Sequence, residues 1–264
     1  MLSLNDEMVA SLEKILPKNP SWQKRLSLLT DYRFGFIEGT DIRYSKIQRR
    51  RVLFEVNNNQ GEVVGLCGRT IDGIEPKYLH PTGYKKGQSL FNIGRVSPKE
   101  QALVVEGNFD AMTATTLWKP CVAIEGVQLT LTQAQRLATF KKGVILALDK
   151  DDAGKLATII ATHKLRALGV KVFIAQWDYA KDLDEYLREH QEFPTVVDVD
   201  DEILLNLYQS VIDYTKYSFV RDAYLSLEKT VGAIKLMRTG VYIPPKPKVG
   251  TGTRYSDYEK FRGS

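Results

Sequence analysis

The chain has 264 residues, of which 43% are hydrophobic and 26% are charged, a composition typical of a globular protein with one or two domains. It excludes collagen-like and wholly disordered chains, and the longest apolar runs fall far short of the roughly 20 residues that a membrane-spanning helix needs. Lys and Arg outnumber Asp and Glu by 37 to 32. Residues 33–99 hold 12 basic and 6 acidic side chains, so the excess of positive charge is local and favours a polyanionic partner.

The cysteine and histidine content argues against a zinc site in this chain. Cys67 and Cys121 are the two cysteines, neither in a C-x-x-C pair, and the three histidines are scattered. We therefore expect no structural zinc. The acidic N-terminus shows no signal-peptide pattern. These features predict a protein of the reducing cytoplasm with no membrane partner.

The first hundred residues predict a helical segment followed by a basic α+β region. Apolar residues at helical spacing predict short helices in residues 1–32, interrupted by Pro17 and Pro20. Two strands at 52–56 and 62–68 flank an Asn-rich turn. We assign residues 1–100 to one unit, an N-terminal helical segment plus a basic α+β subdomain.

From residue 101 short apolar strands alternate with helices. The pattern predicts strands at 102–105, 121–124, 144–148 and 170–175, and helices near 109–118, 130–140 and 153–168. Thr130 suits the N-cap of its helix. Continuous apolar strands separated by helices indicate a parallel sheet covered on both faces. The predicted units are residues 101–190 for this α/β domain, 191–240 for a C-terminal helical region and 241–264 for a flexible basic tail.

Acidic residues follow three of these strands. In parallel α/β sheets the carboxyl ends of the strands share one edge, where ligands bind. The acids predicted to meet there are Glu106, Asp110, Asp149, Asp151, Asp182 and Asp184. Clustered carboxylates favour a hard divalent cation, Mg²⁺ or Mn²⁺, and a metal pair can promote nucleotidyl or phosphoryl transfer. For any single acid, helix capping is an equally good interpretation.

Three motifs carry a resemblance to a known family. Glu106-Gly107-Asn108-Phe109-Asp110 resembles the E-G-x-x-D motif of the TOPRIM (topoisomerase–primase) fold. The segment 149–154 resembles its D-x-D-x-A-G motif, and 182–187 resembles its D-P-D-x-L element, with Leu183 in place of Pro. The fold implied is a Rossmann-like parallel sheet flanked by helices. The implied catalytic metal ligands are Glu106, Asp149 and Asp151, with Asp110, Asp182 and Asp184 as further ligands or nearby anions; Glu106 as a general base stays an alternative.

The preceding basic region is similar to that of bacterial and phage replicative (DnaG-like) DNA primases. The similarity lies in residues 51–54 and 61–69, in Pro76-Lys77-Tyr78-Leu79 and in the K-G-x-x-L-F segment that begins at Lys86. It implies that basic side chains contact template and nucleotide, and the candidates are Arg51, Arg69, Lys77, Tyr78 and Lys86. The family usually has Asn where His80 stands.

The resemblance implies a primase catalytic core that makes short RNA primers on single-stranded DNA from ribonucleoside triphosphates. The zinc-binding module of cellular primases has no counterpart here, so we expect a separate zinc-binding subunit, together with a replicative helicase, as partners. The compact size suggests a phage or mobile-element protein. Two alternatives stay open: a TOPRIM metal-dependent nuclease, and a non-catalytic accessory protein that binds single-stranded DNA.

Overall fold

The computed structural model describes residues 14, 18, 20–37, 50–58, 60–73, 75–190 and 192–210. The other residues, which include most of the predicted N-terminal helices, most of the predicted C-terminal helical region and the predicted tail, lie outside the described part of the chain. No described helix is long and apolar enough to cross a membrane.

The basic region forms a four-stranded antiparallel sheet beside one helix. Helix α2 (Pro20–Leu28) precedes β1 (Phe34–Ile37), β2 (Arg51–Asn57), β3 (Val63–Thr70) and β4 (Tyr78–Leu79), and the strands pair in that order. Pro20 opens α2, where its missing N–H costs nothing. The predicted β2–β3 hairpin is confirmed, whereas β1 and β4 were not predicted.

The second sheet has five strands in the order β6-β5-β7-β8-β9. Its parallel members are β5 (Ala102–Val105), β6 (Cys121–Ala123), β7 (Val144–Leu146) and β8 (Val172–Gln176). An unpredicted edge strand, β9 (Thr195–Asp198), pairs with β8 in the antiparallel direction. The predicted α/β fold with a parallel sheet is confirmed.

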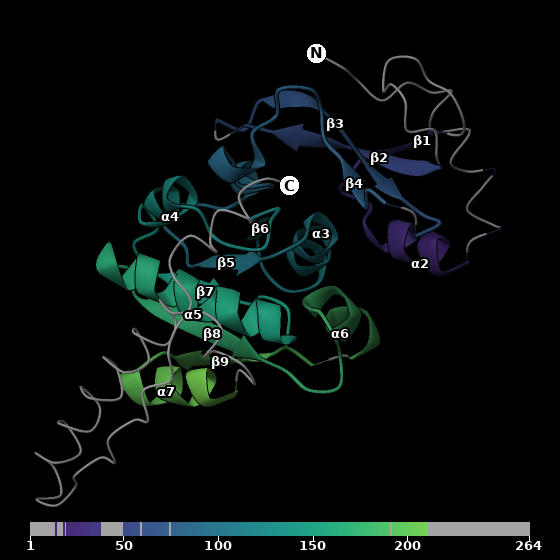
Figure 1. Cartoon of the computed structure of the whole chain (residues 1–264). Coiled ribbons are helices and arrows are strands. Elements are labelled where there is room, and N and C mark those ends of the chain that lie inside the picture. Colours follow the sequence, from purple (N-terminus) through teal and green to yellow (C-terminus); the bar gives the residue numbers. More distant parts are fainter. Residues whose placement is uncertain are drawn as a thin grey trace, which may run out of the picture.

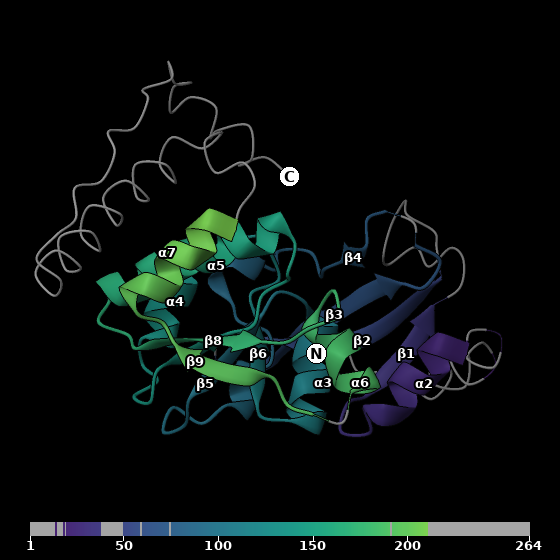
Figure 2. The ribbon, with the colours of Figure 1, turned by 90° about the horizontal axis from the view of Figure 1, so that it is seen from below.

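Helices cover both faces of this sheet (Figures 1 and 2). One face packs on α4 (Leu131–Leu137), α5 (Asp152–Ala167) and α7 (Asp201–Ser210), with Val104 and Leu146 in the shared core. The predicted cap is confirmed, since the Thr130 side chain accepts from the backbone N–H of Gln133 in a capping box. Alternate strand residues such as Leu103 and Val105 point to the other face, which packs on α3 (Asn108–Leu117) and α6 (Leu183–Glu189).

The two sheets share a hydrophobic core. Phe109 of α3 packs edge-on against Phe54 of β2, with ring centroids 5.6 Å apart, and stacks on Phe34 of β1 at 6.2 Å. The segment with the 3-10 turns η3 (Lys86–Gln88) and η4 (Ile93–Arg95) crosses to β6, where Phe91 and Ala123 exchange backbone hydrogen bonds of 3.0 and 3.1 Å. These contacts fix the basic sheet relative to the carboxyl edge of the parallel sheet.

Candidate active site

Glu106 and Asp149 leave neighbouring strands at the same edge of the sheet. Strands β5 and β7 pair in parallel, and the Ala147 N–H donates to the Val104 carbonyl at 2.8 Å. Glu106 follows β5 directly and Asp149 follows the β7 segment, and both side chains are half-buried. The predicted convergence of these two acids is therefore present in the fold.

The carboxylates repel one another. Burial, followed by the negative charges of Asp149 and Asp151, raises the pKa of Glu106 to about 7. Burial, with the charges of Asp182 and Asp151, raises the pKa of Asp149 to about 6. The nearby ammonium of Lys181 opposes both shifts. The site therefore holds more negative charge than its own cations neutralise.

Gly154 brings the start of α5 against Asp149. A Cβ at Gly154 would lie 2.0 Å from the Asp149 carbonyl oxygen, so no other residue fits this close approach. Asp151 is the N-cap of α5, and its carboxylate accepts from the Gly154 N–H at 2.8 Å. The glycine and the second acid of the D-x-D-x-A-G motif thus hold the backbone of the first acid in place.

Gly107 has a similar relation to Asp110 in the first motif. A Cβ at Gly107 would lie 2.5 Å from Asp110 Oδ2. Asp110 accepts from the Asp184 N–H at 3.2 Å. Burial, and then the charges of Asp182, Asp184 and Asp149, raises the pKa of Asp110 well above its usual range. Asp110 therefore lies against the start of α6, within reach of the charges of the other acids.

The last acidic pair has local structural partners. Asp182 is the N-cap of α6 and accepts from the Glu185 N–H at 2.9 Å. Asp184 is 1% exposed and binds Arg25 of α2, Arg188 and the Thr113 hydroxyl. Burial favours the neutral acid, but the charges of Arg25 and Arg188 hold the pKa of Asp184 below its usual range. Asp184 is thus saturated with donors and ties α6 to α2 and α3.

The donor set suits a divalent cation of the Mg²⁺ type, because every candidate ligand is a carboxylate oxygen. Within the described ranges, no three His, Cys, Asp or Glu side chains are already arranged to hold a metal ion. Mg²⁺ commonly takes one or two protein carboxylates and completes its shell with water and substrate phosphates. Any one or two of Glu106, Asp149 and Asp151 meet that requirement.

Arg69 provides a half-buried cation near Asp110. Its guanidinium lies over the Tyr78 ring at 4.8 Å, and its Nε and Nη1 atoms are buried without a hydrogen-bond partner among the described residues. Burial lowers the pKa of Arg69, while the negative charge of Asp110 raises it. Unpartnered guanidinium nitrogens suit a bidentate oxyanion such as a phosphate. Tyr78 is half-buried beneath this guanidinium and is not presented as an open stacking surface.

The other predicted basic residues differ in exposure. Lys77 and Lys86 are exposed, as expected for side chains that contact a polyanion. The prediction for Arg51 is wrong: it is 2% exposed and donates to the carbonyls of Gly68 and Pro76 at 3.0 and 2.8 Å. Its side chain lies on the face of β2 opposite to the core residues Val52 and Phe54, and it is too deeply buried to line a groove.

Glu125, at the end of β6, was missed by the sequence analysis. Its side chain is 1% exposed, accepts from the Tyr84 hydroxyl at 2.5 Å and from Asn108 at 2.7 Å, and lies 3.8 Å from His80 Nδ1. Burial lowers the pKa of His80 to about 4, which keeps the ring neutral. The Glu125 N–H donates to the Glu106 carbonyl at 3.0 Å. The missed signal is a Glu-Gly pair directly after a strand, the same pattern as Glu106-Gly107.

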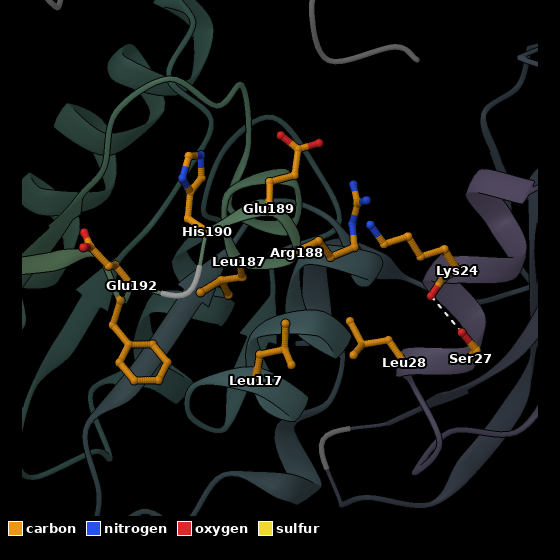
Figure 3. A pocket seen from close by; sticks show the side chains of 10 residues that line it. Lys24, Ser27, Leu28, Leu117, Leu187, Arg188, Glu189, His190 and Glu192 are labelled. Atoms are coloured by element: carbon orange, nitrogen blue, oxygen red, sulfur yellow. Dashed lines mark hydrogen bonds between the residues drawn. The ribbon is translucent and has the colours of Figure 1, made fainter.

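A separate cavity of about 550 Å³ lies between α2 and the end of α6 (Figure 3). Leu28, Leu117 and Leu187 point into it, and Lys24 and Glu189 lie at its rim. It contains none of the predicted site residues.

Comparison with known families agrees with this architecture. Residues 21–97 match the N-terminal domain of the DNA primase catalytic core, and residues 103–187 match a Toprim-like domain. The two matches define the class: a TOPRIM domain joined to the basic domain of a primase core. Both parts of the chain are therefore similar to the corresponding parts of DnaG-like primases.

Individual relatives agree with this assignment. A DNA primase of Staphylococcus epidermidis is 27% identical over 207 residues, which are 73% of this chain and 34% of the relative. The chain spans about a third or less of the curated relatives that it matches. A DnaG catalytic core structure superposes with a TM-score of 0.60 at 20% identity, covering 86% of this chain and 85% of that one. A DnaG primase catalytic domain bound to ssDNA gives 0.58 at 18% identity, covering 89% and 88%. These structures share the fold.

Proposed function

We propose that this chain is a primase catalytic core, which synthesises short RNA primers on single-stranded DNA. The observation that supports the proposal is the mutual repulsion of Glu106, Asp149 and Asp151 after neighbouring parallel strands, together with Arg69 of the basic sheet, whose buried Nε and Nη1 atoms have no hydrogen-bond partner in the described part of the chain. Both halves are needed for nucleotidyl transfer, because a triphosphate requires cations on its oxygens as well as a site for its metal.

In the proposed reaction the 3′-hydroxyl of the growing strand attacks the α-phosphorus of a ribonucleoside triphosphate. The new P–O bond forms as the bond to the β-phosphate oxygen breaks, and pyrophosphate leaves. Glu106, Asp149 and Asp151 would hold Mg²⁺ or Mn²⁺. When bound, the metal activates the attacking hydroxyl and stabilises charge on the leaving oxygen.

The basic residues would hold the two polyanionic substrates. We assign Arg69 to the triphosphate, because its free nitrogens match phosphate oxygens in a forked geometry. Exposed Lys77 and Lys86 would contact backbone phosphates of the template, so binding weakens as salt rises. Tyr78 then orients Arg69 through its ring and does not stack on a base.

Asp110, Asp182 and Asp184 would support the site without holding the metal. Asp110 and Asp182 contribute negative charge behind Asp149, and Asp184 joins α6 to α2. A replicative helicase and a zinc-binding primase subunit are the proposed protein partners, since the family resemblance implies both. The proposed cellular compartment is the cytoplasm.

A three-way assay tests this function. The protein is incubated with single-stranded DNA, labelled ribonucleotides and Mg²⁺ or Mn²⁺, beside Asp149→Ala. New short RNA that is absent with the variant supports primer synthesis. Shortened DNA without synthesis would instead indicate a TOPRIM nuclease, and bound DNA with neither product would indicate an accessory binding protein.

A further inference from the structure

The loop between β8 and α6 presents an aromatic side chain that the proposed mechanism does not use. Tyr179 is 97% exposed, the highest exposure among the large apolar or aromatic side chains recorded as exposed in the described residues. Its backbone is in the left-handed region, with φ at 64°, where a non-glycine residue is rare. At this exposure the ring makes almost no packing contact, so the fold gains nothing from a tyrosine here.

A strained three-residue turn holds this ring outward. The Ala180 N–H donates to the Asp178 carbonyl at 2.9 Å, which closes a γ-turn with Tyr179 at its centre. The residues on either side are fixed, because Trp177 and Ala180 are each 7% exposed. Strain of this kind persists where the surroundings enforce it, and it concentrates at functional positions.

The turn lies beside the carboxylate edge and carries positive charge. The Lys150 N–H, one residue after Asp149, donates to the Lys181 carbonyl at 3.4 Å, and the Lys150 ammonium binds the Trp177 carbonyl. Lys150 and Lys181 are both exposed, and the Lys150 ammonium also lies 4.0 Å from Oδ1 of Asp178, the first residue of the turn. An exposed ring with lysine side chains on neighbouring segments is a combination that binds a nucleobase and its neighbouring phosphates.

We propose that Tyr179 stacks on an unpaired base of a single-stranded DNA template, with Lys150 and Lys181 at the adjacent phosphates. The inference rests on the proposed function only in calling the bound strand a template. The stacking itself requires no synthesis. Because the strained turn fixes the ring before binding, little side-chain freedom is lost on contact.

Fluorescence anisotropy with two labelled oligomers of equal length tests the stacking. One oligomer carries thymine bases and the other carries abasic sites only, so both present the same phosphates. Tyr179→Ala should weaken binding of the thymine oligomer about 5- to 150-fold, the range for one stacked base. Tyr179→Phe should bind within about 2-fold of the unaltered protein, because the ring is kept. All proteins should bind the abasic oligomer alike.

Two further variants separate stacking from a structural effect. Tyr179→Gly should be at least as thermally stable as the unaltered protein, because glycine adopts positive φ without strain, and should bind as weakly as Tyr179→Ala. Phe193→Ala removes another exposed aromatic, 58% exposed, and should leave binding unchanged.

The inference is overturned if Tyr179→Ala binds the thymine oligomer normally, or if its loss is equal on the abasic oligomer. An equal loss in Phe193→Ala, or no binding by the unaltered protein, also overturns it. If the protein made no primers but still bound the thymine oligomer more tightly than the abasic one through Tyr179, the proposed function would be rejected and the stacking would stand.

Discussion

Removal of Arg25 tests whether Asp184 is a structural anchor. The Arg25 guanidinium donates to a carboxylate that is 1% exposed, and it also lies 5.2 Å from the Trp22 ring and 5.0 Å from the Phe109 ring. Deleting one partner of a buried ion pair costs about 3–5 kcal/mol. Arg188 remains to neutralise Asp184, which favours the lower end, and the lost ring contacts add about 0.5–1 kcal/mol. We expect Arg25→Ala to lower the free energy of unfolding by about 3–4 kcal/mol.

Urea unfolding at neutral pH measures this change, with Lys142→Ala as the matched control. Lys142 pairs with Glu100 at 2.9 Å, but both side chains are about 60% exposed, so its loss should cost about 0–1 kcal/mol. The folded pKa of Asp184 lies below its ordinary value of 3.8. Its ionic stabilisation is therefore complete above that value and is lost as pH falls through the lower, folded pKa. The Arg25→Ala penalty should thus shrink only in strong acid. A penalty at neutral pH no larger than that of Lys142→Ala would refute the anchor role.

Three further predictions concern the site. Arg51→Met should lower the free energy of unfolding in urea by about 2–4 kcal/mol, because the carbonyls of Gly68 and Pro76 lose their donor. Its affinity for single-stranded DNA, measured by fluorescence anisotropy at low temperature, should be unchanged. Weaker binding by a folded variant would contradict this prediction. Gly154→Ala should reduce primer synthesis at least 10-fold, because the added Cβ displaces Asp149. The control Ala153→Gly, on the same turn, should lower the free energy of unfolding by about 0.5–1 kcal/mol and keep primer synthesis. Arg69→Leu should raise the melting temperature or leave it unchanged, because the buried Nε and Nη1 atoms of Arg69 lack hydrogen-bond partners among the described residues. The same variant should bind nucleotide more weakly. A large loss of stability with normal nucleotide binding would show that Arg69 is structural.

The β/α rhythm could be predicted because each parallel strand is a continuous apolar run with a clear end. Strand β9 could not, because its four residues, Thr195–Asp198, show no apolar alternation and lie mostly exposed at the edge of the sheet. Strand β4 has only two residues, too few for any periodic pattern. These elements depend on tertiary pairing and not on local sequence.

The error at Arg51 arose because the resemblance of the basic region does not distinguish an exposed arginine from one that is buried in the sheet. In a strand, alternate residues face opposite sides, and Arg51 shares its side with Leu53. Gly68 on the paired strand leaves the space for it, since a Cβ there would lie 3.1 Å from Arg51 Cδ. The glycine before Arg69 was therefore a readable signal that one large side chain folds inward.

The two D-x-D pairs have the same spacing but different roles, and the reason is their register with the helix that follows. In the first pair the second acid, Asp151, is the N-cap of α5, so Asp149 stays in the short segment between β7 and α5 at the carboxyl edge of the sheet. In the second pair the first acid, Asp182, is the N-cap of α6, so Asp184 lies inside the helix and points back to Arg25 and Thr113. Spacing alone cannot distinguish these cases, because the capping residue is chosen by where the preceding strand ends. An acid two residues before an N-cap is thus a candidate ligand, whereas an acid two residues after one becomes a packing partner of the helix.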